Sequence, residues 1–367
     1  MTTFEEALKN LLEASIFNQH TENNYDELRF GPYKQIPFKQ KIKNTVKKAI
    51  GYGKKEAVDI NIKEVRPFIA QLEKIWKNLG PTDQDLLVHI VAYRLLGYEK
   101  IVLPLNNAAY KQALKTAEGL VSGTDTYNPD FLHFILQKFD LKPIGYNIEL
   151  FFSSVAIAID FIVEQYTYKL EGKNIVEAEA GDVVLDVGGC WGDTALYFAH
   201  KVGSNGQVFS FEFIPQNIKL HNINTSLNPA LKSRIGLVPQ PVSDVSDVMV
   251  YYKDFGPAST IDFKPFPDQT GSVNTISIDD YVHNNAISRV DFIKMDIEGA
   301  EPYALKGAIN TIRKFRPKLA IAIYHSMNDL VSIPNWILDL DLGYELFLGH
   351  YTIHAEETII FAKVKSQ

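Results

Sequence analysis

The sequence predicts an α/β fold with a mostly parallel, doubly wound sheet in the C-terminal part of the chain, preceded by a mainly helical region. Beyond residue 180, short runs of β-branched and aromatic residues alternate with segments of helical apolar spacing, which is typical of βαβ units. Before residue 145, apolar residues recur mainly at helical spacing, as in Val65–Leu79 and Asp85–Leu96. A chain of 367 residues is also long for one domain. We therefore predict a helical region over 1–145 and a second domain over 146–367.

Seven runs in the second domain are strand candidates. They are Val183–Val187, Gln207–Phe213, Ile235–Val242, Val290–Met295, Lys318–Tyr324, Tyr344–Leu348 and Thr358–Ala362. The loop between the last two is too short for a crossover helix, so these two are expected to form an antiparallel hairpin at an edge of the sheet. The segment 146–180 is expected to bridge the two regions and to pack over the carboxyl edge of the sheet.

Composition and charge exclude several classes of protein. The chain has 44 acidic and 37 basic residues and a formal charge of -7, so a general affinity for nucleic acid is not expected. Its single cysteine, Cys190, cannot form an internal disulfide, and the first residues lack the pattern of a signal peptide. The longest apolar stretch, 148–163, contains Glu149 and Asp160 and is shorter than the roughly 20 residues that span a bilayer. The sequence therefore predicts a cytoplasmic protein without a transmembrane segment.

The segment 34–55 is strongly basic. It contains eight lysines and no acidic residue, and Phe38, Ile42, Val46 and Ile50 recur within it at every fourth position. This spacing places an apolar stripe along one side of a helix with lysines around it. Two interpretations follow: a helix that lies on an anionic membrane surface, which would be peripheral contact at the inner face of the membrane, or a solvated basic helix whose stripe packs on the protein's own core.

A glycine-rich turn follows the first strand candidate and opens a helix predicted at Thr194–Val202. The turn spans Asp186 to Thr194 and reads Asp-Val-Gly-Gly-Cys-Trp-Gly-Asp-Thr. Glycines there let a ligand approach the backbone, and the N–H groups at the helix start can receive its anionic part. A dinucleotide-binding turn requires G-x-G-x-x-G, and Cys190 stands at the second required glycine. Asp186 would also repel a pyrophosphate but suits an amino group. The candidate ligand contacts are Asp186, Gly188, Gly189, Cys190, Asp193 and Thr194.

An acidic residue after the next strand completes a cofactor pattern. Glu212 lies 26 residues after Asp186, where a carboxylate can accept hydrogen bonds from two ribose hydroxyls. Phe213 could then cover an adenine. An amino-acid group, a ribose and an adenine in this order describe S-adenosylmethionine, with S-adenosylhomocysteine as the product. The alternative is that Asp186 caps the helix and Glu212 ends a strand at the surface.

With these motifs, residues 146–364 resemble the FkbM family of S-adenosylmethionine-dependent methyltransferases, and much of the N-terminal part resembles members encoded with polysaccharide genes. The resemblance rests on the turn from Asp186 to Thr194, on Phe211–Phe213, on Lys294–Glu301, and on Tyr324-His325 followed by Asp329. It implies a Rossmann-like, seven-stranded methyltransferase sheet and methyl transfer to oxygen, usually on a hydroxyl of a sugar or a secondary metabolite.

The resemblance also implies adenine contacts at the end of the third strand, at Ser243 and Asp244. Most Ser-Asp pairs of this kind form turns, which is the alternative interpretation.

Methyl transfer to a hydroxyl requires a group that removes the hydroxyl proton, either a base or a metal that acidifies the hydroxyl. His325 follows the strand candidate Lys318–Tyr324 on the same edge as Asp186, and we predict that it is the general base. Asp329, four residues later, could fix its tautomer. The alternative is that His325 only forms hydrogen bonds that shape the pocket.

Two acidic residues end the fourth parallel strand. Asp296 and Glu298 are two positions apart and would face the same way, so we expect Asp296 to contact the methionine group or take part in catalysis and Glu298 to bind the acceptor. Capping of a helix predicted at Glu301–Phe315 is an alternative. Two carboxylates are few ligands for a metal ion, so a divalent metal is possible but not favoured. His350, near the hairpin, is a candidate substrate contact at the rim of the pocket.

The sequence therefore favours an S-adenosylmethionine-dependent O-methyltransferase that acts on a hydroxyl of a glycan, a polysaccharide precursor or a related metabolite. Two alternatives remain. One is an NAD-dependent oxidoreductase on the same fold, against which Cys190 argues. The other is a non-catalytic interaction protein that keeps the cofactor pocket and recruits a complex through its basic segment.

Overall fold

The computed structural model describes residues 2–18, 24–25, 53–132 and 134–365. The chain divides into two compact units. The first contains Met1–Ala109 together with His350–Thr358, and the second contains Tyr110–Gly349 together with Ile359–Gln367.

The first unit is helical. Its elements are α1 (Phe4–Ser15), α5 (Lys54–Val65), the short turn η1 (Arg66–Phe68), α6 (Ile69–Lys77) and α7 (Pro81–Leu96). In α1, the apolar residues Phe4, Leu8 and Leu12 recur at every fourth position and are fully buried, as an amphipathic helix requires. Thr3 and Glu6 form a capping box at its start.

The basic segment 34–55 lies outside the described residues up to position 52, so its contact with a membrane surface stays a prediction. Within the described ranges, no helix is both long enough and apolar enough to cross a membrane.

The second unit is built on a seven-stranded sheet in the order β14-β15-β13-β12-β6-β7-β8. The strands are β6 (Val183–Val187), β7 (Gln207–Phe211), β8 (Ile235–Val238), β12 (Phe292–Met295), β13 (Lys318–Ala322), β14 (Tyr344–His350) and β15 (Thr358–Val364). Strands β13, β12, β6, β7 and β8 are parallel, and β15 is antiparallel to β13. The predicted fold class is therefore confirmed, and each of the seven strand candidates contributes one strand.

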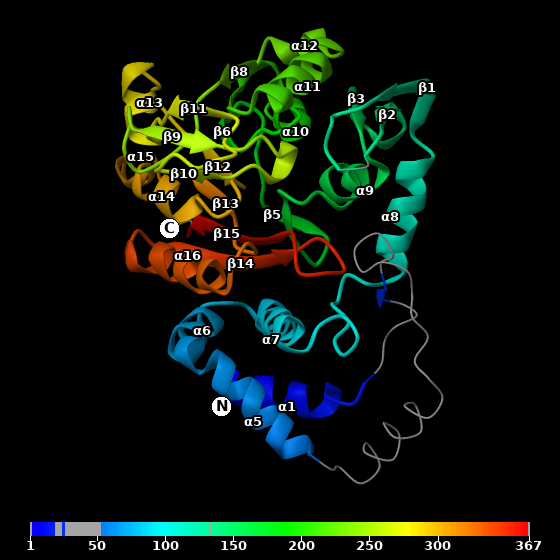
Figure 1. Cartoon of the computed structure of the whole chain (residues 1–367), viewed down its shortest axis with the longest axis vertical. Helices are drawn as coiled ribbons and strands as arrows, with labels where there is room; N and C mark the ends of the chain where they lie inside the picture. The colour runs from blue at the N-terminus through cyan, green and yellow to red at the C-terminus, as the bar shows by residue number, and fades with distance from the viewer. Residues whose placement is uncertain (1, 19–23, 26–52, 133, 366–367) are drawn as a thin grey trace. The chain divides into compact units, whose positions relative to one another are not determined.

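Helices cover the sheet in two groups (Figure 1). The first group contains α10 (Asp193–Lys201), α11 (Pro215–Ser226) and α12 (Pro229–Lys232), which contact one another. The second group contains α13 (Ile278–Asn284), α14 (Glu301–Lys306), α15 (Ile309–Phe315) and α16 (Met327–Asp339). The chain continues from β6 into the first group and from the neighbouring strand β12 into the second. The direction in which the chain leaves the sheet thus changes between two neighbouring strands. The ends of β6 and β12 are therefore the switch point of the sheet, where open α/β sheets bind ligands.

The single helix predicted at Glu301–Phe315 is wrong: the structure has two helices, α14 and α15, separated at Gly307. A Cβ atom at Gly307 would lie 2.1 Å from the carbonyl oxygen of Ser243. The backbone here passes so close to Ser243, on the segment that follows β8, that only glycine fits, and the helix is interrupted at this contact.

Three smaller sheets complete the second unit. One contains β1 (Val121–Tyr127), β2 (Leu136–Asp140) and β3 (Glu149–Phe152), one contains β9 (Met249–Tyr252), β10 (Ile261–Asp262) and β11 (Gly271–Asn274), and one contains β4 (Tyr168–Leu170) and β5 (Lys173–Val176). Helix α8 (Ala108–Glu118) precedes β1. Helix α9 (Ser154–Ile157) and a π-helical turn, η3 (Ala158–Val163), lie between β3 and β4.

The compact units divide the chain at 109/110, whereas the boundary predicted from the sequence is 145/146. The reason lies in the hydrogen bonds of β3. The side-chain oxygen of Asn224 in α11 accepts from the backbone N–H of Phe151 at 2.8 Å, and that of Asn228 accepts from the N–H of Glu149 at 2.9 Å. These bonds tie the β1–β3 sheet to the helices of the second unit.

Candidate functional site

A cavity opens at the carboxyl ends of β6, β7 and β12, at the switch point of the sheet. Gly188, Cys190, Glu212 and Phe213 line one part of it, and Asp296 and Glu298 line another. Some of the residues predicted to bind the cofactor and two of those predicted to face the acceptor therefore border one cavity within the second unit.

The glycine-rich turn is shaped by the strand beside it. Gly188 has φ 91°, and a Cβ atom there would lie 1.9 Å from the carbonyl oxygen of Asp296. Gly189 meets the Ser210 hydroxyl equally closely, because a Cβ atom there would also lie 1.9 Å from its oxygen. These glycines are required for packing between β6 and its neighbours.

Asp186 holds this turn instead of lining the cavity. Its carboxylate is 0% exposed, accepts hydrogen bonds from the hydroxyls of Thr194 at 3.0 Å and Ser210 at 2.9 Å, and lies 3.3 Å from the Lys294 ammonium. Burial lowers the pKa of Lys294, but the carboxylates of Asp186 and Asp296 raise it more, so the net pKa is raised. The buried pair therefore joins the end of β6 to β12.

Glu212 faces the cavity in a fixed orientation. Its carboxylate accepts from the backbone N–H of Ile214 at 2.7 Å and from the Asn217 side-chain amide at 3.2 Å. Asn217 in turn accepts from the Trp191 indole N–H at 3.1 Å, which links Glu212 to the glycine-rich turn. Burial raises the pKa of Glu212 to about 7, although these hydrogen bonds oppose the shift. A buried, oriented carboxylate of this kind can accept hydrogen bonds from two vicinal hydroxyls of a ligand.

The remaining predicted cofactor residues differ in their access to the cavity. Phe213 lines it and meets the Tyr252 ring edge-on at 5.4 Å. Ser243 also lines it and donates to Asp244 at 3.1 Å, whereas Asp244 is exposed and outside the lining. Asp193 is buried at the start of α10, and its Oδ1 atom has no hydrogen-bond partner among the described residues. Burial raises the pKa of Asp193 to about 6.

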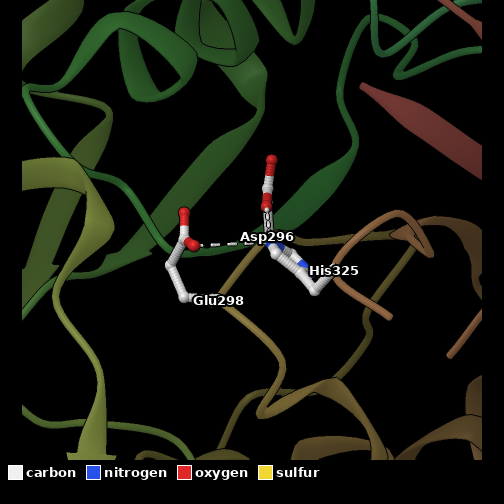
Figure 2. A group of neighbouring side chains, drawn as sticks. All are labelled: Asp296, Glu298 and His325. Carbon is white, nitrogen blue, oxygen red and sulfur yellow. Dashed lines mark ion pairs between the residues drawn. The ribbon is translucent and has the colours of Figure 1, made fainter. Parts of the chain in front are cut away.

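Asp296, Glu298 and His325 form a second group of polar side chains, the acceptor-side cluster (Figure 2). The His325 Nε2 atom lies 3.4 Å from Asp296 Oδ1 and 3.7 Å from Glu298 Oε2. On the other side of the ring, Nδ1 lies 3.5 Å from Glu301 Oε1. The imidazole is therefore placed between three carboxyl groups.

These neighbours change the ionisation of the cluster. Burial lowers the pKa of His325, but Glu301, Asp296 and Glu298 outweigh it and raise the pKa to about 9. Burial and the charge of Asp296 raise the pKa of Glu298 to about 7, although His325 opposes the shift. In the absence of other ligands, the imidazole is thus mostly protonated at neutral pH, and it balances part of the surrounding negative charge.

Two tyrosines hold Asp296 in this cluster. The Tyr324 hydroxyl donates to its Oδ1 at 3.0 Å, and the Tyr166 hydroxyl donates to its Oδ2 at 3.2 Å. Tyr166 belongs to the segment 146–180, so this part of the segment does pack over the carboxyl edge of the sheet, as expected from the sequence.

The structure differs from the sequence-based expectation for Asp329. Asp329 lies in the first turn of α16, where its carboxylate accepts from the Ser326 hydroxyl at 2.7 Å and its backbone N–H donates to the same hydroxyl. Within the described chain, no hydrogen bond or ion pair joins Asp329 to His325. Its side chain is engaged in helix capping, and Glu301 takes the position expected for it beside the imidazole.

His350 is also placed differently from the expectation. It belongs to the first compact unit, is buried, and its Nδ1 atom shares a hydrogen bond with the Thr358 hydroxyl at 2.9 Å. Burial lowers the pKa of His350 to about 3. It does not line the cavity of the second unit.

Sequence reasoning missed three residues that shape the site. Tyr166 and Glu301 act on the acceptor-side cluster, and Asn217 orients Glu212. Glu301 was predicted only to start a helix. Its spacing of three residues after Glu298 is the signal that could have placed it on the same edge, whereas Tyr166 lies 130 positions from Asp296 and carries no such signal.

The fold is Rossmann-like, with a cavity at the switch point of its parallel sheet. Residues 176–346, slightly less than half of the chain, match the family model of the methyltransferase FkbM domain. The resemblance predicted from the sequence is confirmed over this range. Comparison with curated proteins found no match.

Several solved structures are similar to parts of the chain. A methyltransferase FkbM from Methylobacillus flagellatus KT has 18% sequence identity and a TM-score of 0.49, with 83% of this chain and 61% of that chain covered. This chain thus spans about three fifths of that protein. Fibrillarin from Aeropyrum pernix, in complex with natively bound S-adenosyl-L-methionine, has 12% identity and a TM-score of 0.34, with 66% and 99% covered. A SAM-dependent O-methyltransferase from Thermotoga maritima has 14% identity and a TM-score of 0.31, with 52% and 62% covered.

Proposed function

We propose that the protein is an S-adenosylmethionine-dependent O-methyltransferase that acts on a hydroxyl of a glycan, a polysaccharide precursor or a related metabolite. One observation carries the proposal: a single cavity is bordered by the oriented carboxylate of Glu212 on one side and by Asp296 and Glu298 on the other. A methyl donor and an acceptor bound to these two sides would be adjacent, as an in-line displacement requires.

The residues on the Glu212 side of the cavity suit the successive parts of S-adenosylmethionine: the methionine part, the ribose and the adenine. The N–H groups at the start of α10 and the glycine-rich turn can receive the carboxylate of the methionine part. Glu212 can accept hydrogen bonds from both ribose hydroxyls, and Phe213 and Ser243 border the same part of the cavity, where an adenine would follow.

The acceptor side supplies groups for a hydroxyl. In the reaction, the bond between the sulfonium sulfur and the methyl carbon breaks, a bond between that carbon and the acceptor oxygen forms, and the hydroxyl proton leaves. Asp296 and Glu298 can accept hydrogen bonds from hydroxyls of a sugar, and His325 lies directly behind them at 3.4 and 3.7 Å. The products are S-adenosylhomocysteine, a methyl ether and a proton.

Binding measurements on the full chain test the cofactor part of the proposal. Titration calorimetry with S-adenosylhomocysteine is expected to show one site per chain, and titration with NAD under the same conditions is expected to show no binding. Binding of NAD without binding of S-adenosylhomocysteine would favour the oxidoreductase alternative and contradict the proposal.

Glu212→Ala is expected to weaken S-adenosylhomocysteine binding by about 1.5 to 3 kcal/mol, the usual worth of hydrogen bonds to a charged acceptor. Calorimetry measures the change. Glu179→Ala is the matched control, because Glu179 is 70% exposed and pairs with Lys318 at the opposite edge of the sheet. Unchanged affinity in folded Glu212→Ala protein would remove Glu212 from the cofactor site.

The affinity for S-adenosylhomocysteine is expected to depend on pH through Glu212. Because burial raises the pKa of this carboxyl to about 7, the ionised form that accepts two hydrogen bonds predominates only above that pH. The affinity should therefore rise with pH and level off above about pH 7. Below pH 7, each unit of pH should change the affinity by up to about tenfold. Glu212→Gln should remove this part of the dependence, and an identical pH profile in the variant would show that another group titrates.

A further inference from the structure

The acceptor-side cluster has the donor atoms of a metal site. Asp296, Glu298 and His325 each offer one atom, and the three atoms lie within 4.8 Å of one another. Ligands of an octahedral cation of the size of Mg²⁺ to Ca²⁺ lie about 3 to 3.5 Å apart when adjacent and about 4 to 5 Å apart when opposite. The separations of 3.4 and 3.7 Å between His325 Nε2 and the two carboxylates are close to this range. His325 thus supplies the third ligand that the two carboxylates lack.

The imidazole itself points to a ligand. His325 is 10% exposed, and neither of its ring nitrogens has a hydrogen-bond partner among the described residues. Its Nε2 atom nevertheless faces the space between the carboxylates of Asp296 and Glu298, as the dashed lines in Figure 2 show. A buried ring nitrogen aimed between two acids becomes a ligand atom when a cation displaces its proton.

Residues around the cluster would orient these ligands. Metal-binding histidines commonly direct their second ring nitrogen to a carboxylate, and ligating carboxylates are themselves hydrogen-bonded. Glu301 Oε1 lies 3.5 Å from His325 Nδ1, and the same oxygen is fixed by the backbone N–H of Ile297 at 2.7 Å. The hydroxyls of Tyr166 and Tyr324 hold Asp296.

Charge and access favour the same conclusion. Three carboxyl groups surround one imidazole, while Lys294 is paired with Asp186. Asp296 and Glu298 line the cavity, and Glu298 is 32% exposed, so a cation between them could be reached by a substrate. Two carboxylates and one imidazole suit Mn²⁺, which takes oxygen and imidazole ligands, better than ions that prefer sulfur ligands or oxygen ligands alone.

We propose that Asp296, Glu298 and His325 bind a divalent cation with the ligand preferences of Mn²⁺, whose open positions take the acceptor hydroxyl. Such a cation would orient the hydroxyl and make its proton easier to remove. The catalytic use of the cation rests on the proposed methyltransferase function, whereas the binding of the cation does not.

Binding of Mn²⁺ alone to the full chain, stripped of metal by chelation and dialysis, tests the proposal. Calorimetry and the loss of the electron paramagnetic resonance signal of free Mn²⁺ should both show one ion per chain. Glu298→Gln and His325→Ala should each weaken binding at least tenfold, and Tyr324→Phe, which removes only a positioning hydroxyl, should weaken it by about tenfold or more. Glu179→Gln, the exposed control at the opposite edge of the sheet, should bind Mn²⁺ like the unaltered protein.

The proposal is overturned if the unaltered protein binds no Mn²⁺ at millimolar concentration, or if Glu298→Gln and His325→Ala bind it with unchanged affinity. S-adenosylhomocysteine affinity, measured on the same samples, shows that each variant is folded and separates the two proposals. Binding of Mn²⁺ without S-adenosylhomocysteine would support the cation site and contradict the methyltransferase function. Binding of S-adenosylhomocysteine without Mn²⁺ would overturn the cation site alone.

Discussion

His325→Ala is expected to lower the turnover number for methyl transfer by about 10²- to 10⁴-fold, the usual worth of a positioned group that promotes proton removal. The imidazole lies 3.4 Å from Asp296 and 3.7 Å from Glu298, and both of these acids line the cavity. The loss is therefore expected whether the neutral form of His325 takes the proton or His325 holds a cation that acidifies the hydroxyl.

The affinity for S-adenosylhomocysteine should stay nearly constant in the same variant, because Glu212 and its partner Asn217 form no contact with His325. Steady-state kinetics with saturating cofactor, combined with calorimetry, separates the two effects. His283→Ala is the matched control, since His283 is exposed on α13 and outside the cavity lining. If His325→Ala retained most of its turnover, the acceptor-side cluster would not be the place of proton removal.

Asp186→Asn is expected to lower the free energy of unfolding by about 3 to 5 kcal/mol, because it leaves a buried ammonium group without its counter-charge. Lys294 is 2% exposed and Asp186 is 0% exposed, and their charged groups lie 3.3 Å apart. The same change disturbs the hydrogen bonds that Asp186 accepts from Thr194 and Ser210. Urea denaturation at neutral pH measures the loss.

The control for this prediction is Asp182→Asn, at the other end of the same strand. Asp182 pairs with Lys318 at 2.9 Å, but Lys318 also pairs with Glu179 at 2.7 Å. The lysine therefore keeps a counter-charge in the variant, and the loss should be smaller, about 1 kcal/mol. The double variant Asp186→Asn/Lys294→Met should recover part of the stability lost in Asp186→Asn, because it removes the uncompensated charge. Equal losses in Asp186→Asn and Asp182→Asn would show that the buried Asp186–Lys294 pair contributes no more to the free energy of unfolding than the Asp182–Lys318 pair.

The sheet could be predicted from the sequence because its signal is local. Runs such as Val183–Val187 and Lys318–Tyr324 are short, β-branched and bounded by polar residues or glycine, and each run contains a strand of the sheet. The order of the strands in a doubly wound sheet then places the residues that follow β6, β7 and β12 on one edge. This is why Glu212, Asp296 and Glu298 could be assigned to one site without a structure.

Contacts between distant segments could not be predicted in the same way. Tyr166 reaches Asp296 only because the π-helical turn η3 and the residues after it fold back over the sheet. The break at Gly307 depends on its contact with Ser243, which lies on another segment.

Two of the residues whose roles differ from the expectation illustrate competing local interactions. Asp329 stands four residues after His325, a spacing compatible with contact, but the side chain of Ser326 forms an N-cap with it and engages the carboxylate. Asp186 follows the pattern of a ligand-binding acid at a strand end, but Lys294 on the neighbouring strand pairs with it inside the core. In both cases a nearby polar partner occupies the carboxylate.

The most direct test of the account is transfer of a labelled methyl group. The full chain is incubated with methyl-labelled S-adenosylmethionine, Mn²⁺ or Mg²⁺, and glycans extracted from its own cells, and the label is then located by mass spectrometry. The account predicts label in a methyl ether on a glycan hydroxyl, formed by the unaltered protein and reduced at least a hundredfold with His325→Ala. Absence of label from every glycan fraction, in a sample that binds S-adenosylhomocysteine, would contradict the account and favour an interaction protein that keeps the cofactor pocket.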